Sequence, residues 1–235
     1  MPEQGLVYAA AGQDETLRRM RLAENYNAWL FERARPFVGR RILDAGAGIG
    51  TFTEQLAAHA DLVVAAETDP RFVSVLRERF ATRANVRVEA RDATAVDERF
   101  DTVICFNVLE HIRDEAAALA GFRDLLDPGG RLLLLVPAHP FLYGGIDRTV
   151  EHERRYTRAG LQQSLSAAGF ELDVLRHVNP VGALGWLVSG RILRRDQIPT
   201  GPLRFYDRLI PLFRALDALP LPVGLSLWAV ARRPL

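Results

Sequence analysis

The sequence predicts an α/β domain whose largely parallel sheet is covered by helices on both faces. Two observations support this fold class: short apolar segments of strand length alternate along the chain with segments of helical spacing, and a glycine-rich loop follows the first strand. Strands that alternate with helices pair in parallel through right-handed crossovers. Because 49% of the 235 residues are apolar, the chain can bury one sizeable core. We therefore expect a single domain over residues 1–235.

The first half of the chain contains five expected strands with helices between them. The strands are apolar segments at residues 40–45, 61–67, 85–90, 99–106 and 131–137. The intervening helices are expected at residues 51–59, from just after Pro70 to about 81, and at 114–126. The sequence Asp127-Pro128-Gly129-Gly130 predicts a turn before the fifth strand. That strand is a continuous apolar run, which indicates burial on both faces.

The second half adds two strands and departs from this rhythm. After a loop, a helix is expected at residues 157–168, with Gly169 as its stop, followed by strands at 170–178 and 226–233. Two segments lie outside the alternation. The expected organisation is an N-terminal helical cover (14–38), a cofactor-binding core (40–178), a helical insert (179–224) and a closing strand (225–233).

Charge and cysteine content exclude several classes of function. The net charge is +1, so no global field indicates a nucleic-acid partner, and the absence of lysine excludes Schiff-base chemistry. The single cysteine, Cys105, lies in an apolar segment, so we expect an inert buried thiol and no metal site. The N-terminus lacks a secretory signal, and no apolar run reaches the roughly twenty residues that span a bilayer. A soluble, cytoplasmic protein is expected.

The glycine loop in ILDAGAGIGTF, residues 42–52, indicates a nucleotide-like ligand at the carboxyl ends of the strands. Its glycines stand at alternate positions: Gly46, Gly48 and Gly50. The dinucleotide fingerprint G-x-G-x-x-G would require a glycine where this chain has Thr51, so the spacing does not suit a pyrophosphate. The carboxylate of Asp44 would also repel a pyrophosphate, whereas it suits a ligand with an ammonium group.

Acidic residues also follow the second and third strands. Glu67 can accept two hydrogen bonds from a ribose diol, and Asp92 can accept one from an exocyclic amine, with Ala93 near a base edge. Ammonium, ribose and adenine in this order describe S-adenosylmethionine. Plainer roles stay open: the glycines as turn formers, Glu67 as a solvated acid and Asp92 as a helix N-cap.

These residues resemble the motifs of class I S-adenosylmethionine-dependent methyltransferases over roughly residues 40–137 and the closing strands. FNVLEHI, residues 106–112, is similar to the motif after strand 4 in the subgroup that includes quinone-biosynthesis methyltransferases. The resemblance implies a Rossmann-like sheet of seven strands in the order 3-2-1-4-5-7-6, with strand 7 antiparallel, helices on both faces and a helical cap. It also implies S-adenosyl-L-methionine as cofactor. The residues expected to bind it are Asp44, Gly46, Gly48, Gly50, Glu67, Thr68, Asp92, Ala93 and Asn107, with Tyr26 on the covering helix.

Methyl transfer from a sulfonium is an in-line displacement, and a hydroxyl or amine acceptor must also lose a proton to a base. Three histidines are candidates for this catalytic role. His139, directly after strand 5, is the first choice, followed by His152 in a charged stretch and His111 just past strand 4. A solvated charged face at His152 and a simple helix start at His111 are the alternatives. An N-P-P-Y motif is absent after strand 4, which disfavours adenine and glutamine-amide acceptors.

The C-terminal part of the chain is basic and apolar. Residues 176–235 hold nine arginines against three aspartates, a net +6, while the rest of the chain carries −5. One helical face of residues 203–216 is apolar, formed by Tyr206, Leu209, Ile210, Phe213 and Leu216. Pro211 is expected to kink or break this helix. Such an insert suits a small-molecule or lipid-like acceptor and peripheral membrane contact. An ordinary amphipathic cap or a homodimer interface is the plainer interpretation.

Three other functions fit parts of the pattern. A non-catalytic S-adenosylmethionine-binding protein would need the same cofactor residues. A nicotinamide-dependent oxidoreductase is disfavoured by Thr51, and a nucleic-acid methyltransferase by the lack of a basic, aromatic groove outside the insert. The sequence leaves open the acceptor, the methylated atom and the oligomeric state.

Overall fold

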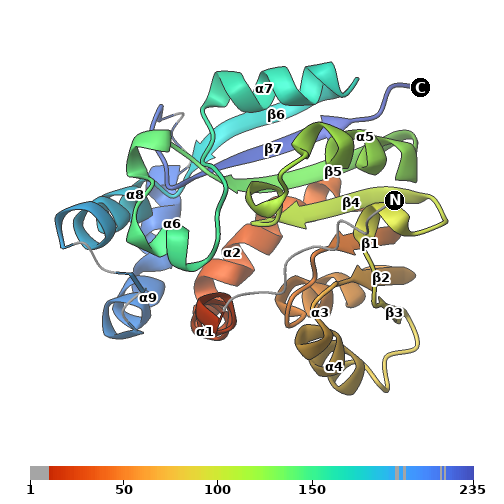
Figure 1. Cartoon of the computed structure of the whole chain (residues 1–235), viewed down its shortest axis with the longest axis horizontal. Helices are drawn as coiled ribbons and strands as arrows, with labels where there is room; N and C mark the ends of the chain where they lie inside the picture. Colours follow the sequence, from red (N-terminus) through yellow and green to blue (C-terminus); the bar gives the residue numbers. More distant parts are fainter. Residues whose placement is uncertain (1–10, 194–195, 198–199, 218, 220) are drawn as a thin grey trace.

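A computed structural model describes residues 11–193, 196–197, 200–217, 219 and 221–235 of the protein. Its centre is a seven-stranded sheet in the order β3-β2-β1-β4-β5-β7-β6, with helices on both faces (Figure 1). The strands are β1 (Arg41–Ala45), β2 (Leu62–Ala66), β3 (Val86–Glu89), β4 (Phe100–Phe106), β5 (Leu126–Pro137), β6 (Glu171–Val178) and β7 (Ser226–Arg232). β7 is antiparallel to both β5 and β6, and the other pairs are parallel. The predicted fold class, strand order and direction of strand 7 are confirmed.

Helices precede, connect and cap the sheet. They are α1 (Ala11–Arg21), α2 (Glu24–Ala34), α3 (Thr51–Ala57), α4 (Pro70–Arg79), α5 (Glu115–Leu125), α6 (Gly145–Thr149), α7 (Arg158–Ala167), α8 (Pro180–Trp186) and α9 (Thr200–Asp217). Short 3₁₀ turns are η1 (Arg35–Phe37), η2 (Ala93–Ala95), η3 (Leu109–His111) and η4 (Pro140–Leu142), and η5 (Leu187–Ile192) is a π-helix.

Side-chain caps explain where two of the connecting helices begin. The Asp69 side chain accepts a hydrogen bond from the backbone N–H of Arg71, and Pro70 occupies the first helical position of α4. Thr157 caps α7 in the same way, by accepting a bond from the N–H of Gly160 at 3.0 Å. The starts of α4 and α7 are therefore determined by residues close in sequence, and both lie near the positions predicted from the sequence.

The core consists of two main apolar clusters, one on each face of the sheet. Alternate residues of β5 enter them: Leu132 and Leu134 pack on the side of α5 and α7, while Leu133 and Leu135 pack on the side of α2. All four are fully buried, as the continuous apolar run predicted.

The turn predicted at residues 127–130 is wrong as a boundary, because these residues lie within β5. The register with β4 shifts at this point, so the segment bulges from the ladder. Gly129 adopts φ 79° and donates to the carbonyl of Arg233, whose own N–H donates to the carbonyl of Gly130. The chain beyond β7 therefore holds the glycine pair in the sheet.

Three other local expectations need correction. The helical segment 14–38 is divided into α1, α2 and η1, with a break near Leu22. The loop expected after β5 contains η4 and α6. Pro211 does not end its helix, since α9 continues through it.

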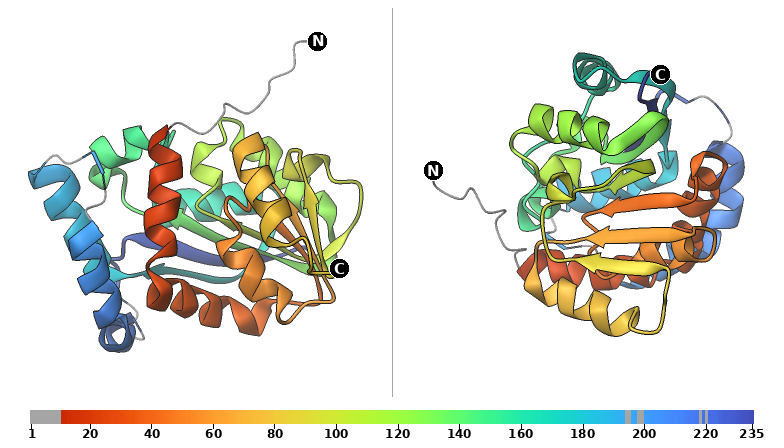
Figure 2. Two further views of the ribbon diagram at one scale, coloured as in Figure 1. Left: turned by 90° about the horizontal axis from the view of Figure 1, so that it is seen from below. Right: turned by 90° about the vertical axis from the view of Figure 1, so that its right-hand side faces the viewer.

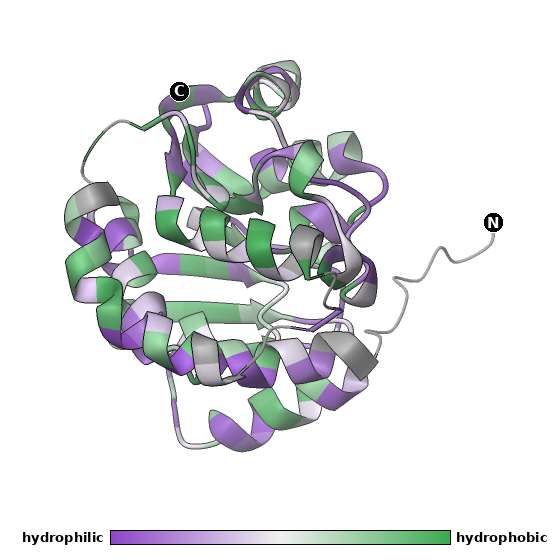
Figure 3. Cartoon of the chain, turned by 90° about the vertical axis from the view of Figure 1, so that its left-hand side faces the viewer, coloured by the Kyte–Doolittle hydropathy of each residue, from purple (hydrophilic) through white to green (hydrophobic). Residues whose placement is uncertain are grey.

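The insert forms α8, η5 and α9 at one end of the molecule (Figure 1). On α9, Ile210 is buried and packs in the same cluster as α2, whereas Arg204, Arg208 and Arg214 are exposed, as the helical pattern predicted. Figure 3 shows apolar and polar residues mixed along these helices. Residues 194–195 and 198–199 and the side chain of Leu216 lie outside the described part. Among the described helices, none combines the length and apolarity that a bilayer crossing requires.

Candidate functional site

The glycine loop connects β1 to α3 in a backbone conformation that favours glycine. Gly46, Gly48 and Gly50 all have left-handed φ values, of 72°, 55° and 78°. A Cβ at Gly46 would stand 2.6 Å from Cγ2 of Val108, which follows β4, and one at Gly50 would stand 2.6 Å from the Phe80 ring. The loop is thus pressed between the segment after β4 and the end of α4.

The first helix, α1, covers the same loop. A Cβ at Gly48 would lie 3.4 Å from Cδ1 of Leu17. Figure 2 shows α1 and α2, both red, running in different directions beside the sheet. Tyr26, expected to line the cofactor site, is buried in the α2 cluster, where its ring centroid lies 5.7 Å from that of Trp29. The contact of Leu17 with the glycine loop was not predicted, because in the sequence Leu17 is an ordinary apolar residue of a helix.

Asp44 near the end of β1 is buried, and its Oδ2 accepts a hydrogen bond of 2.6 Å from the Thr53 hydroxyl. Burial raises the pKa of Asp44 to about 6; the Thr53 hydrogen bond opposes this rise, and the charge of Glu67 adds to it. A carboxylate in this position is stabilised by a cation, because a nearby positive charge offsets the cost of its burial.

Glu67, directly after β2, ties the glycine loop to its own strand end. Its Oε2 accepts from the N–H of Gly48 at 2.8 Å, and its Oε1 accepts from the N–H groups of Thr68 and Asp69 at 2.7 and 2.9 Å. Glu67 is therefore more than a solvated acid. Thr68 is exposed beside it.

Asp92 caps η2, after β3, and Ala93 is the first residue of that turn. Oδ1 of Asp92 accepts from both the N–H and the hydroxyl of Thr94, at 2.8 and 2.7 Å, so the N-cap role considered above is present. Asn107 lies at the end of β4 with φ 53°, is exposed, and donates its N–H to the carbonyl of Leu135. Contacts of these residues with a cofactor stay a prediction.

The sheet order places the three acids in one row. β3, β2 and β1 are neighbours, so Asp44 near the end of β1, Glu67 after β2 and Asp92 after β3 lie at the same edge. The row continues across β4 to Asn107 and the segment that touches Gly46. This edge is where ligands bind in open α/β sheets.

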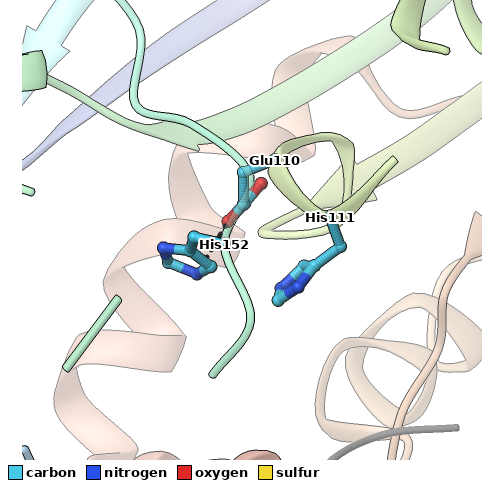
Figure 4. Close-up of side chains that lie close together, drawn as sticks. All are labelled: Glu110, His111 and His152. Atoms are coloured by element: carbon cyan, nitrogen blue, oxygen red, sulfur yellow. Dashed lines mark ion pairs between the residues drawn. The ribbon is translucent and has the colours of Figure 1, made fainter. Parts of the chain in front are cut away.

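A second group of functional side chains follows β4. Glu110 and His111 belong to η3, and His152 reaches them from the loop after α6 (Figure 4). The two imidazole centroids are 4.8 Å apart, and Nε2 of His152 lies 3.7 Å from Oε1 of Glu110. Burial raises the pKa of Glu110 to about 7 and lowers that of His111 to about 4.

Asp147 in α6 organises the loop that carries His152. Its Oδ1 lies 2.9 Å from Nδ1 of His152 and accepts a bond of 2.7 Å from Nε of Arg155, while Oδ2 accepts from the N–H of Gly144. Burial alone would raise the pKa of Asp147, but the hydrogen bond with His152 and the charge of Arg155 hold it below its usual value. Asp147, His152 and Arg155 of the charged stretch therefore point into the protein. The alternative interpretation, a wholly solvated charged face at His152, is not observed.

A family model described as a methyltransferase domain matches residues 16–175. The chain belongs to this family. It is 39% identical over 103 residues to a ubiquinone biosynthesis O-methyltransferase of Cereibacter sphaeroides, covering 42% of this chain and 41% of that protein. It is 30% identical over 159 residues to a ubiquinone biosynthesis O-methyltransferase of Azorhizobium caulinodans, covering 60% and 62%. The chain thus spans less than two thirds of either relative.

The fold of this methyltransferase also matches solved structures. Phosphoethanolamine N-methyltransferase 2 of Haemonchus contortus, in complex with S-adenosyl-L-methionine, superposes with a TM-score of 0.64 at 20% identity, over 90% of this chain and 53% of that one. The predicted class I family is confirmed, and S-adenosyl-L-methionine is its cofactor.

The three histidines predicted as catalytic candidates lie in two places. His139 adopts φ 61° and stacks on His177 of β6, with centroids 4.9 Å apart and planes within 4°. Burial, and then the charge of Arg155, lower the pKa of His139. His111 and His152 instead meet at Glu110, a residue that sequence reasoning did not select. The adjacency of Glu110 and His111 was visible in the sequence, but the approach of His152 was not.

Proposed function

We propose that this methyltransferase moves the methyl group of S-adenosylmethionine to an oxygen of a small-molecule or lipid-like acceptor. The row of Asp44, Glu67 and Asp92 along adjacent strand ends, beside a left-handed glycine loop, carries the cofactor part of the proposal. Asp44 pairs with the ammonium group of the cofactor, Glu67 with its ribose and Asp92 with its adenine.

The reaction is an in-line displacement. The acceptor oxygen attacks the methyl carbon, the carbon–sulfur bond breaks, and S-adenosylhomocysteine leaves with the bonding electrons. The proton of the acceptor hydroxyl is taken up at the group formed by Glu110, His111 and His152. His152 is the best-positioned member, because Asp147 holds its Nδ1 and directs Nε2 toward Glu110.

Two observations favour an oxygen on an apolar acceptor. Both relatives described above bear the name O-methyltransferase, of ubiquinone biosynthesis. In the insert, the exposed Phe205 and Leu212 of α9, together with the exposed Arg204 and Arg208, suit an apolar molecule with a negative group. Peripheral membrane contact, a homodimer and a cytoplasmic location stay predictions.

Calorimetric titration with S-adenosylhomocysteine and with NADH tests the cofactor assignment. We expect wild type to bind the former alone. Asp44→Ala should weaken binding by about thirtyfold or more, because losing one partner of a buried charge pair costs about 2 kcal/mol or more. Glu67→Ala should also weaken it, because it removes both the ribose acceptor and the tie to Gly48.

Asp61→Ala is the matched control for these variants. Asp61 precedes β2 at the opposite edge and pairs with Arg40 in solvent. If Asp44→Ala and Glu67→Ala bound S-adenosylhomocysteine as well as Asp61→Ala does, the assignment of the cofactor site would be wrong.

Transfer of a radiolabelled methyl group tests the acceptor. Apolar phenols and catechols are offered beside amines of similar size, and the product is located by mass spectrometry. Label on a phenolic oxygen supports the proposal. Cofactor binding with no transfer to any of these compounds would instead support a non-catalytic binding protein.

A further inference from the structure

We infer that Glu110, His111 and His152 form a binding site for a divalent transition-metal ion such as Zn²⁺. One potential ligand atom from each of the three residues lies within 4.8 Å of the others (Figure 4). Two imidazoles and one carboxylate are a donor set that Zn²⁺ and related ions prefer.

Glu110 supplies an independent observation. Its side chain is fully buried, and neither carboxylate oxygen has a hydrogen-bond partner. Among the residues whose side chains the structure describes, it is the only carboxylate in this condition. An unpaired buried carboxylate is costly, and groups of this kind are normally paired or coordinate metals. A cation bound between Glu110 and the histidines would offset this cost.

The tautomers of both histidines agree with this role. Nδ1 of His111 lies 3.3 Å from the backbone carbonyl of Glu151, which can only accept, and Nδ1 of His152 lies 2.9 Å from the carboxylate of Asp147. Both Nδ1 atoms therefore carry hydrogen, and in the neutral imidazoles both Nε2 atoms present a lone pair. Metal-binding histidines are held in this way, by a carboxylate or carbonyl on the second nitrogen.

The distances leave room for an ion. Nε2 of His152 and Oε1 of Glu110 are 3.7 Å apart, longer than a hydrogen bond. Zinc bonds of about 2.0–2.2 Å place tetrahedral ligands about 3.4 Å apart, so binding needs only a small inward movement of the three side chains. Three protein ligands also leave a fourth position for an oxygen atom.

That open position connects the ion to the acceptor. With the ion bound, Nε2 of His152 is a ligand and no longer takes up the proton of the acceptor. A hydroxyl at the open position instead loses its proton to solvent, because the ion lowers the pKa of that hydroxyl, and the resulting oxyanion attacks the methyl carbon. This consequence rests on the proposed function, whereas binding of the ion does not.

Metal titration of the full chain, after treatment with a chelator, tests the site. We expect Zn²⁺ to bind by calorimetry at one ion per chain, and Co²⁺ to give the visible absorption of a tetrahedral site. Outer-shell changes typically alter metal affinity about 10–100-fold, so Glu110→Gln and His152→Ala should weaken binding by about 100-fold or more. His177→Ala, which changes the other histidine pair, should bind as wild type does.

Circular dichroism and S-adenosylhomocysteine binding are measured on the same samples. They separate a lost metal site from an unfolded chain and from a failed cofactor assignment. Absence of stoichiometric binding in folded wild type would overturn the inference. So would unchanged binding in Glu110→Gln and His152→Ala, or loss of binding in His177→Ala instead. The alternative then is direct pairing of His152 with Glu110, without an ion.

Discussion

The carboxylate of Asp207 in α9 accepts a hydrogen bond of 2.9 Å from the backbone N–H of Tyr26, in the first turn of α2. Its other oxygen accepts from the side chain and the N–H of Asn25, at 3.1 and 3.3 Å. The residue preceding α2, Ala23, makes no side-chain cap. The cap of the covering helix therefore comes from the insert, 181 residues further along the chain.

Asp207→Ala should destabilise the protein by about 1–2 kcal/mol, because it removes a buried cap and a charge from a helix N-terminus. Urea unfolding followed by circular dichroism measures the change. Asp61→Ala, which removes an exposed partner of Arg40, should alter stability by less than about 1 kcal/mol. Equal losses in the two variants would argue against the capping role.

Asp44→Asn should stabilise the cofactor-free protein at neutral pH. The folded state raises the pKa of Asp44 from 3.8 to about 6, so it holds the proton more tightly than the unfolded state does. Its contribution to stability is present below about pH 4 and is lost as the pH rises through 6, a loss of about 3 kcal/mol. In denaturant unfolding, the free energy of unfolding of Asp44→Asn should exceed that of wild type by an amount that increases from about pH 4 to about pH 6. A gain that does not depend on pH would contradict the assignment.

Cofactor affinity should show the opposite dependence on pH. Only the ionised form of Asp44 attracts the ammonium group, so affinity for S-adenosylhomocysteine should fall as the pH drops below about 6. Calorimetry from acid to neutral pH measures this fall. Asp44→Asn, which binds weakly throughout, should have a nearly flat profile, and a wild-type profile equally flat would exclude Asp44 as the ammonium partner.

Gly50→Ala should destabilise the protein by about 2 kcal/mol or more. A left-handed residue with a side chain costs about 1–2 kcal/mol, and the added Cβ would also press against Phe80 and Leu76. Gly185→Ala is the control, because its Cβ meets nothing within 4 Å in helix α8, and alanine there should stabilise by about 0.5–1 kcal/mol. Thermal and urea unfolding of the pair should therefore shift in opposite directions.

Asp147→Ala should cost about 3–5 kcal/mol of stability, because it leaves Arg155 charged and buried without its partner. Glu153→Ala removes the exposed ion pair with Arg113 from the same loop and should cost less than about 1 kcal/mol. Chemical denaturation distinguishes the two. A small loss for Asp147→Ala would mean that Arg155 finds other acceptors.

Much of the fold and of the cofactor edge could be predicted from sequence, because their signals are local. Alternation of apolar segments located the strands, helical periodicity located α4 and α7, and the glycine spacing separated this loop from a dinucleotide site. Strand order came from resemblance to a family, and the structure confirms it.

What only the tertiary structure decided involves residues that are distant in sequence. His152 meets Glu110 and His111 because α6 and its loop fold back over η3, and Asp207 caps α2 because α9 packs on it. Residues 127–130 read locally as a turn, yet Arg233 holds them in the sheet. Local patterns determine backbone conformation and which face is apolar. Packing between distant elements determines which polar groups are buried together. This burial sets the pKa values and the ion pairs of the site.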